Sequence, residues 1–297
     1  MVNELGQHTT RAAIDRYHES QPRRRSRRLG MSTIGESCSR RIWYHFRWAK
    51  QESFSGRMLR LFRRGSREEE TVVQDLRDIG CVLTHTGSDQ LELKIGPHVV
   101  GYPDGVIESG LPEAPETRHL LEIKTHNTKS FAKLQKEGIP HRHMAQMQGC
   151  MGAAKIDRCL YVGVCKDDDS LHIERVYFDQ EMAGKIKARA DMIVSAPEAP
   201  LRIKDDPSWY ECKFCPFASI CYKEEAAEKN CRTCAHSTPV DDGWMCERWG
   251  KLIPDHIIEE GCQAYVPHPD MHPGEIIEAD GWTATYEWKG REVKYGV

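Results

Sequence analysis

The stretch VVGYPDGVIE (residues 99–108), followed after a loop by HLLEIKT (residues 119–125), decides how this chain is organised. Apolar and small residues fill both faces of the first segment, which is typical of a strand buried in a central sheet. In the second segment, strand alternation places Glu122 and Lys124 on one face and the aliphatic residues on the other. With Asp104, they form the pattern D-x17-E-x-K on two expected strands.

Charged groups on an otherwise apolar strand need compensation, because a buried charge is costly unless it is paired or binds a metal. A salt bridge at a strand edge would meet this need. A divalent cation would meet it as well, with Asp104, Glu122 and the carbonyl of Ile123 as oxygen ligands. In that case Lys124 would orient or deprotonate an attacking water, or neutralise charge on a phosphate. Both interpretations fit these residues alone.

Length and composition limit the possibilities further. The 297 residues suit one large domain, or one domain with a small appendage. Hydrophobic residues make up 39% and charged residues 29%, and the net charge is -3, so nucleic-acid binding would depend on local basic patches. No apolar run approaches membrane-spanning length and no signal-peptide core is visible, so we expect a cytoplasmic protein without membrane partners.

The segment 57–79 carries the clearest helical periodicity, in Met58, Phe62, Gly65, Val72, Leu76 and Ile79. Glu69 falls near the centre of this apolar stripe, whereas the glutamates on either side of it fall well away. A carboxylate aimed into the core is the anomaly of this segment. We therefore expect Glu69 to lie beside Asp104 and Glu122; the alternative is a helix rotated slightly from this alignment.

Periodicity and turn residues predict the remaining elements. Further helices are expected at 3–20, 128–136, 139–154 and 179–195, several strands across 81–125, a strand pair at 158–166 and 171–178, and a terminal hairpin with its turn at Lys289 and Gly290.

Two segments near the N-terminus are basic. Residues 21–28, QPRRRSRR, suit either a solvated linker or a phosphate-contacting arm. Farther on, Arg40, Arg41 and Arg47 alternate with aromatic residues on an expected helix. Such a pattern suits nucleic acid, because rings stack on bases and guanidinium groups bind phosphates, but it also suits a core-facing helix. We expect a mixture, with arginines at the substrate and the aromatic residues mostly in the core.

Twelve cysteines without a secretion signal favour metal binding over disulfides. Four of them are expected to be small buried hydrophobic residues: Cys81, Cys150, Cys159 and Cys165. The pattern Cys212-x2-Cys215-x5-Cys221 lacks a fourth ligand in its own loop. Cys38 could complete it, and a zinc site that uses Cys231 is the alternative.

A second set, Cys231-x2-Cys234-x11-Cys246-x15-Cys262, has the spacing of a small zinc module, in which His236 or His256 could replace one ligand. The segment is short and poor in apolar residues, so metal binding would supply its folding free energy. Such a module could bind DNA, bind a partner or brace the C-terminus.

Taken together, these motifs resemble the PD-(D/E)XK nuclease superfamily, and more narrowly the RecB-type and phage lambda-type exonucleases, including CRISPR-adaptation nucleases with an iron–sulfur cluster. Five pieces within residues 31–221 carry the resemblance in the family's order: Gly65-x3-Glu69, Pro103-Asp104, Glu122-Ile123-Lys124, Gln146-Met147-Gln148, and Cys38 with Cys212, Cys215 and Cys221. One position departs from the RecB-type pattern, which usually has Tyr where this chain has Gly152. The C-terminal cysteine module lies outside the family pattern.

The resemblance implies an α/β fold with a central mixed sheet flanked by helices. It implies a DNA exonuclease that hydrolyses phosphodiester bonds with Mg²⁺ or Mn²⁺. Glu69, Asp104 and Glu122 would hold the ion, and Lys124 would position the water. Gln148, and Gln146 as a second candidate, would hold the scissile phosphate or the water.

The resemblance also implies a structural [4Fe-4S] cluster on Cys38, Cys212, Cys215 and Cys221. The partners would be DNA ends and a recombination or strand-annealing protein, in a bacterial host if the gene is carried by a phage. A non-catalytic DNA-binding recombination partner is the alternative. The expected domains are residues 1–30 (helix and basic arm), 31–225 (nuclease domain) and 226–297 (zinc-type module and hairpin).

Overall fold

The computed structural model describes residues 4–23, 25–241 and 243–297. Its centre is a five-stranded sheet in the order β2-β5-β6-β7-β8, formed by β2 (Val82–Thr84), β5 (Gly105–Ser109), β6 (His119–His126), β7 (Arg158–Cys165) and β8 (Leu171–Tyr177). Strands β6 and β7 run parallel, and the other neighbours run antiparallel. The expected mixed α/β fold is therefore confirmed.

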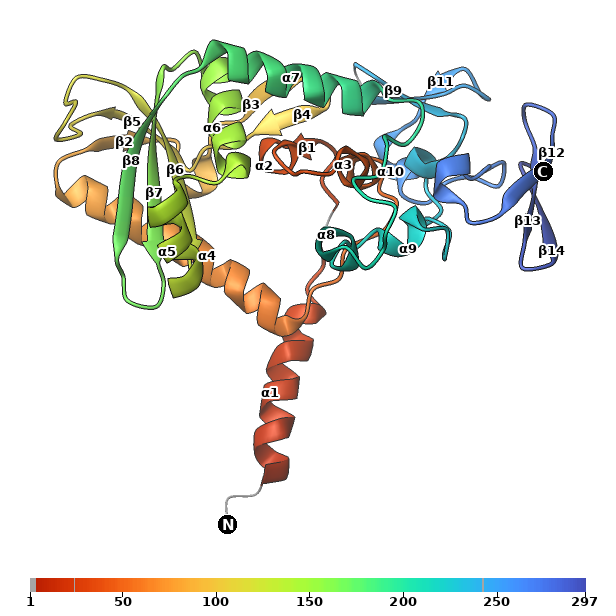
Figure 1. The fold of residues 1–297 in the computed structure, drawn as a ribbon, viewed down its shortest axis with the longest axis horizontal. Coiled ribbons are helices and arrows are strands. Elements are labelled where there is room, and N and C mark those ends of the chain that lie inside the picture. The colour runs from red at the N-terminus through yellow and green to blue at the C-terminus, as the bar shows by residue number, and fades with distance from the viewer. Residues whose placement is uncertain (1–3, 24, 242) are drawn as a thin grey trace.

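Helices cover both faces of this sheet (Figure 1). Helix α4 (Gly56–Asp78) packs its Val72, Val73 and Leu76 against Leu121 and Ile123 of β6, in a cluster that includes aliphatic residues of β7. This contact explains the helical periodicity seen in the sequence. The parallel connection from β6 to β7 passes through α5 (Thr128–Glu137) and α6 (His141–Ala154), which lie on the opposite face.

The first quoted stretch forms two strands, and the expectation of one continuous strand is wrong. Strand β4 (Val99–Gly101) joins β1 (Leu29–Gly30) and β3 (Leu93–Gly96) in a separate three-stranded sheet, whereas β5 begins at Gly105 in the central sheet. Between them lies Pro103, which has no N–H to donate and interrupts a ladder. The break leaves Asp104 at the start of β5.

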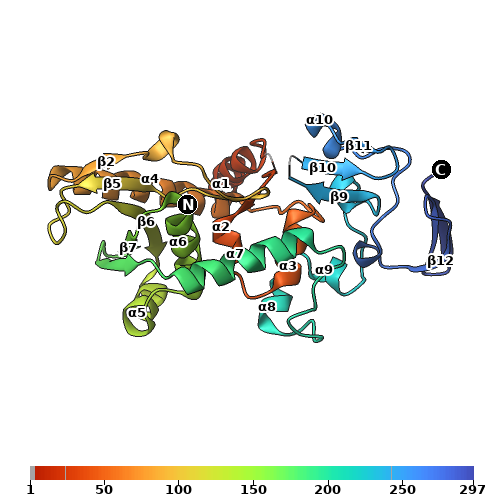
Figure 2. The ribbon, with the colours of Figure 1, turned by 90° about the horizontal axis from the view of Figure 1, so that it is seen from above.

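The N-terminal helices pack beside this core. Helix α1 (Glu4–Glu19) contacts α4 and projects away from the body of the protein (Figure 1). Helices α2 (Met31–Ile34) and α3 (Ser39–Phe46) follow, and α3 buries Trp43, Tyr44 and Phe46. Helix α7 (Gln180–Ser195) runs from the sheet to α3 and connects the two ends of the molecule (Figure 2).

The described residues of the basic segment 21–28 form ion pairs with distant segments, while Arg23 and Arg27 stay exposed. Arg25 pairs with Glu228, Arg27 pairs with Asp255, and Arg28 lies 2.7 Å from Glu92. The Trp48 indole donates to the carbonyl of Ser26. The carboxylates of distant segments therefore hold this basic chain against the fold; Arg24 lies outside the described residues.

The C-terminal third consists of short elements. These are α8 (Tyr210–Lys213), α9 (Ala218–Cys221), β9 (Ser237–Val240), β10 (Gly243–Cys246), β11 (Lys251–Leu252), α10 (Asp255–Ile258), β12 (Glu275–Ala279), β13 (Ala284–Trp288) and β14 (Arg291–Tyr295), with single 3-10 turns η1 (Gly87–Asp89), η2 (Cys231–Thr233) and η3 (Pro269–Met271) along the chain. The expected terminal hairpin is present, and Lys289 (φ 53°) and Gly290 (φ 71°) form its turn.

The boundary expected at residue 226 does not separate two hydrophobic cores. Trp244, Ile258 and Met271 belong to the same buried cluster as Ile42 and Trp43 of α3. Within residues 226–297, the terminal sheet β12-β13-β14 has a small cluster of its own, built on Val266, Ala284 and Tyr286. Within the described residues, no helix is long and apolar enough to cross a membrane.

Candidate active site

The site begins where β5 ends its pairing with β6. Gly105 lies opposite Leu121, so the rest of β6 has no neighbour on that side. Asp104 fills the vacant position. Its N–H donates to the Leu121 carbonyl at 2.9 Å, and its Oδ2 accepts the Ile123 N–H at 2.6 Å. A carboxylate thus replaces a strand at this edge. Because the N–H and C=O of a strand residue point to the same neighbour, the Ile123 carbonyl faces the same opening.

Glu122 and Lys124 leave β6 on the face covered by α6. The Glu122 side chain is 2% exposed, and its Oε2 accepts the Gln146 amide at 2.9 Å. The Lys124 ammonium pairs with the other oxygen, Oε1. The charges of Glu122 and Asp104 raise the pKa of Lys124, even though burial acts in the opposite direction. The amine therefore stays protonated beside its carboxylate.

Glu69 reaches the same place from α4. Burial, followed by the charge of Asp104, raises the pKa of Glu69 to about 7, and Lys124 acts to lower it. Burial likewise raises the pKa of Glu122 to about 7, with contributions from Asp104 and Glu69. These mutual effects mean that the four side chains share one electrostatic environment. The charges of Glu69, Asp104, Glu122 and Lys124 therefore act on one another, with Glu69 contributed by α4 on the other face of β6.

The charge balance of this group suits a divalent cation. Three carboxylates face one ammonium, which leaves two negative charges without a partner when all are ionised. The described residues nevertheless contain no group of three or more His, Cys, Asp or Glu side chains already arranged as a metal site. At Glu122, Gln146 and Lys124 contact the two carboxylate oxygens. Ligation by Glu122 would require Lys124 to release Oε1.

The two glutamines of the Gln-x-Gln motif have different surroundings. Gln146 faces Glu122, as described. Gln148 points away: its Nε2 donates to the Tyr177 carbonyl at 2.8 Å, and its Oε1 accepts the Asp179 N–H at 2.8 Å. The expectation that Gln148 holds the phosphate therefore does not match its placement. Residues two apart on a helix cannot face the same point, and Gln146 takes the position at the site.

The three arginines predicted to contact substrate also differ. Arg47 is 3% exposed and donates to the carbonyls of Arg232 and Ser237, so it does not face a substrate in this structure. Arg47 directly follows the last residue of α3 and turns inward, which the alternation of arginines and aromatic residues did not indicate. Arg40 and Arg41, by contrast, line a cavity that contains the first cysteine set.

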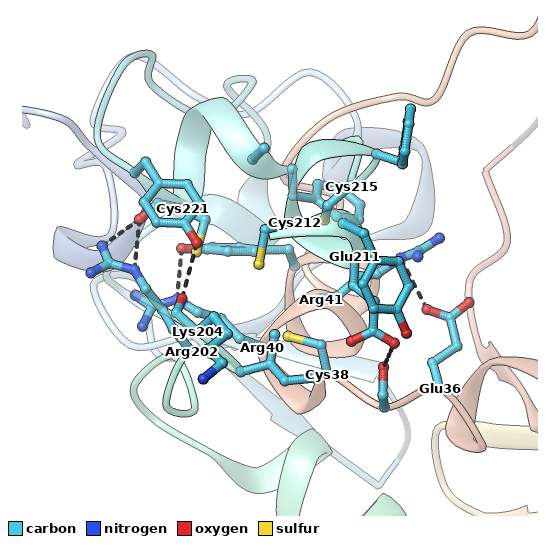
Figure 3. A pocket seen from close by; sticks show the side chains of 18 of the residues that line it. Glu36, Cys38, Arg40, Arg41, Arg202, Lys204, Glu211, Cys212, Cys215 and Cys221 are labelled. Carbon is cyan, nitrogen blue, oxygen red and sulfur yellow. Dashed lines mark hydrogen bonds and ion pairs between the residues drawn. The ribbon is translucent and has the colours of Figure 1, made fainter. Parts of the chain in front are cut away.

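This cavity has a volume of about 420 Å³ and is lined by all four predicted cluster cysteines, Cys38, Cys212, Cys215 and Cys221. Figure 3 shows Cys38 facing the other three, which come from α8, α9 and the loop between them. All are free thiols. The charges of Cys38 and Cys221 act on Cys215, although burial is the main cause that raises its pKa to about 11. The residues present therefore fit a thiolate-bound group in this space.

The four cysteines of the second set line another, smaller cavity, together with His236 and Tyr265. His256 lies elsewhere, on α10, beside the basic segment. The remaining four cysteines are buried in strands, helices and turns as expected for small hydrophobic residues: Cys81, Cys150, Cys159 and Cys165.

Sequence reasoning missed a polar group beside Lys124. The Tyr161 hydroxyl on β7 lies 3.1 Å from Nε2 of His126 and 3.0 Å from Nδ1 of His143. His126 shares its strand face with Glu122 and Lys124, so the alternation E-x-K-x-H carried a usable signal. His143, one helical turn before Gln146 on α6, was a second signal in the sequence. Burial lowers the pKa of His143 to about 3, and the charge of Lys124 lowers it further.

Gly152, where the RecB-type pattern has Tyr, faces away from this group. A Cβ at Gly152 would contact the ring of Phe178 at 3.4 Å and Ala183 of α7. The position is thus part of the contact between α6 and α7, and a tyrosine there would point into that contact.

No protein-family model matches this sequence, and no curated protein matches it. Among solved structures, the alkaline exonuclease LHK-Exo from Laribacter hongkongensis aligns over 57% of this chain and 87% of its own, at 19% identity and a TM-score of 0.43. Its complex with dAMP covers the same shares at 20% identity and a TM-score of 0.43. The protein SSO0001 aligns over 73% of this chain and 96% of its own, at 16% identity and a TM-score of 0.41. At TM-scores below 0.5, these likenesses do not assign an activity to this chain.

Proposed function

We propose that this protein is a Mg²⁺- or Mn²⁺-dependent DNA nuclease that hydrolyses phosphodiester bonds, acting as an exonuclease on DNA ends. One observation supports the proposal above the others. Asp104 occupies the unpaired edge of β6 and shares an electrostatic environment with Glu69 of α4 and with Glu122 and Lys124 of β6.

In this proposal, Glu69, Asp104, Glu122 and the Ile123 carbonyl hold the divalent ion. When bound, the ion supplies Lewis-acid polarisation of the phosphoryl oxygens. Gln146 keeps the Glu122 carboxylate in one orientation through its 2.9 Å hydrogen bond. Asp104 is fixed by the Ile123 N–H. The carboxylates are thus oriented by protein hydrogen bonds before substrate arrives, which lowers the reorganisation needed during reaction.

Lys124 has two possible partners in this arrangement. In the structure its ammonium compensates Glu122. With Glu122 holding a divalent ion, the Lys124 amine would no longer be needed to compensate that carboxylate and could face the attacking water or the scissile phosphate. The charges of Glu122 and Asp104 outweigh the effect of burial and keep Lys124 protonated, so its role in this proposal is to orient the water and to stabilise the negative charge that develops on phosphorus.

The first cysteine cavity is proposed to hold a [4Fe-4S] cluster in a structural role. Cys38 precedes α3 and the other three ligands belong to the α8–α9 segment, so a shared cluster would join two regions distant in sequence. Arg41, Arg202 and Lys204 line the same cavity and would balance the negative charge of thiolates and cluster. Replacing Cys212 by Ser should remove iron and the brown colour from protein prepared without oxygen.

The nuclease proposal is tested with end-labelled single- and double-stranded DNA in the presence of Mg²⁺ or Mn²⁺. We expect release of short products by the wild-type protein. Asp104→Asn and Lys124→Met should each reduce the rate about 100-fold to 1,000-fold, the range seen when one group that stabilises the transition state is lost. Lys185→Met, on the exposed surface of α7, is the matched control and should cleave normally.

Two results would contradict this proposal. Unchanged cleavage by both Asp104→Asn and Lys124→Met would show that the reaction occurs elsewhere. Binding of DNA ends without cleavage in any divalent ion would instead support the non-catalytic alternative, a DNA-binding partner in recombination. We place the nuclease in phage or recombination-type DNA processing, which would be supported by stimulation or retention by a strand-annealing protein.

A further inference from the structure

The second cysteine set surrounds a cavity of about 20 Å³, which Cys231, Cys234, Cys246 and Cys262 line together. They come from η2 and the residue after it, from the end of β10, and from the loop after α10. All four are free thiols, so the structure does not join them by disulfides. A cavity of this size accommodates one water-sized particle or a single ion.

The four sulfurs are close enough to affect each other. Burial raises the pKa of Cys231 to about 12, and the charges of Cys234, Cys262 and Cys246 raise it further. Burial likewise raises the pKa of Cys234, with contributions from Cys262 and Cys246. Four thiolates could share this space only with a cation among them.

Backbone N–H groups point toward two of these sulfurs, which is an observation independent of the cavity. Gly261 donates to Cys231, and His236 and Val266 donate to Cys234. Hydrogen bonds of this kind favour the charged form of a group and are typical of thiolates that bind metals. The Ile257 carbonyl lies at the same place, where it accepts the Gly261 N–H at 3.3 Å and the Cys231 thiol at 3.8 Å.

Arg232, which lies between Cys231 and Cys234, connects the site to the core. Arg232 is 3% exposed, its Nη1 donates to the Phe46 carbonyl at 2.9 Å, and its Nη2 donates to the Arg27 carbonyl at 2.7 Å. Its guanidinium lies 3.8 Å from the centre of the Trp48 ring. The described structure shows no carboxylate within ion-pair distance of Arg232. Hydrogen bonds to two backbone carbonyls and the contact with the Trp48 ring, rather than a salt bridge, therefore connect Arg232 to the core.

We propose that Cys231, Cys234, Cys246 and Cys262 bind one Zn²⁺ as a structural tetrathiolate site that holds Arg232 against α3. Zinc favours four sulfur ligands in tetrahedral geometry, and such sites contribute folding free energy directly. The strands beside it, β9, β10 and β11, have two to four residues each and bury Trp244 as their main apolar contribution. The ion supplies the stability that this short sheet lacks. The site goes beyond the proposed nuclease function and does not depend on it.

Elemental analysis separates this site from the first cysteine set. We expect one zinc per chain in the wild type, one zinc in Cys212→Ala, and none in Cys246→Ala. The catalytic variant Lys124→Met should also keep its zinc, so a failure of the nuclease proposal leaves this result interpretable. Zinc retained in Cys246→Ala, or iron in place of zinc in Cys212→Ala supplied with both metals, would overturn the proposal.

A second measurement needs no substitution, in case Cys246→Ala does not fold. The wild-type protein is stripped with a chelator and reloaded with Co²⁺, which should give the visible absorption of tetrahedral cobalt thiolate and then lose it stoichiometrically on addition of Zn²⁺. Absence of that absorption would overturn the tetrathiolate assignment.

The role of Arg232 is tested by comparing chelated and zinc-loaded protein. Chelation should lower the Tm of the wild type more than that of Arg232→Met, because the variant has already lost the contact that the metal maintains. Arg232→Met should still contain one zinc per chain. Equal decreases in Tm for both proteins would show that the ion does not act through Arg232.

Discussion

At the scale of single residues, the neighbouring glutamines of α6 show what spacing can and cannot predict. The motif Gln146-Met147-Gln148 marks a helix beside the sheet, and α6 is there. Which glutamine faces Glu122 depends on the rotation of the helix about its axis, which is set by contacts with β6 and α7. The sequence alone therefore could not distinguish Gln146 from Gln148.

Substitution of these two glutamines should have separable effects. Gln148→Leu leaves the Asp179 N–H and the Tyr177 carbonyl without their partner, so we expect the free energy of unfolding to fall by about 1 to 3 kcal/mol. Gln146→Leu removes the group that orients Glu122, so its main effect should be a lower cleavage rate. Its effect on the free energy of unfolding should be smaller than that of Gln148→Leu. Urea unfolding and the DNA cleavage assay measure the two effects. The opposite pattern would contradict these assignments.

Glu69 makes the stability of the metal-free protein depend on pH. Its pKa is raised from 4.5 to about 7, so its folded form prefers the protonated carboxyl. Its contribution to stability is present below pH 4.5 and is lost as the pH rises through 7. In EDTA, Glu69→Gln should therefore have a higher Tm than the wild type at pH 8 and a similar Tm at pH 4.5.

Two comparisons control this experiment. Glu137 is an exposed glutamate on α5 that does not act on Glu69, and Glu137→Gln should follow the wild type at both pH values. Excess Mg²⁺ at pH 8 should raise the Tm of the wild type more than that of Glu69→Gln, because the ion compensates the carboxylate charge. A Tm difference between wild type and Glu69→Gln that does not change with pH would contradict the proposed surroundings of Glu69.

At the scale of elements, periodicity predicted the long helices and most strands because they bury one face in a regular pattern, whereas the four-residue helices α2, α8, α9 and α10 are too short to show one. Helix α4 is an example, since Val72, Val73 and Leu76 pack on the central sheet. The break between β4 and β5 was not predicted, because small and apolar residues on both sides of Pro103 suit either one strand or two. Strand β4 belongs to a separate sheet because it pairs with β1, which is distant in sequence. The alternation of residues within one segment does not identify such a partner.

The hydroxyl of Tyr161 connects three elements, namely β6, β7 and α6. Tyr161→Phe leaves His126 and His143 without this partner, so we expect a loss of about 1 to 3 kcal/mol in the free energy of unfolding. Tyr177→Phe, on the exposed side of β8, is the control and should be neutral. Denaturant unfolding of the three proteins measures the difference, and equal stability of Tyr161→Phe and wild type would contradict the role of this hydroxyl.

At the scale of the whole molecule, the cysteine spacings indicated two thiol groups, and the structure places each set around a cavity of its own. The sequence did not indicate that the C-terminal segment completes the core of the N-terminal one. Arg47 shows why: its basic character suggested a surface, whereas its carbonyl partners belong to residues 232 and 237. Contacts of such long range leave no local pattern in the sequence.

Truncation should therefore have very different effects at two positions. Removal of 274–297 deletes β12, β13 and β14, whose small cluster is separate, so a cooperative thermal transition should persist at a lower Tm. Removal of 226–297 uncovers α3 and deletes Trp244, so we expect an aggregated product. Circular dichroism and gel filtration distinguish the cases. A folded monomer from the longer deletion would show that residues 226–297 form an independent domain.

The position of Asp104 at the end of β5 has a consequence for solubility. An exposed edge strand can pair with strands of other molecules, and proteins commonly prevent this with charged side chains at the edge. The Asp104 carboxylate occupies the Ile123 N–H, so the same side chain that would hold a cation also guards β6 against intermolecular pairing. Asp104→Ala would remove the cation ligand and the group that blocks intermolecular pairing at the same time. Loss of cleavage in that variant would therefore not distinguish altered chemistry from self-association. Asparagine keeps an acceptor at this margin, which makes it the informative replacement.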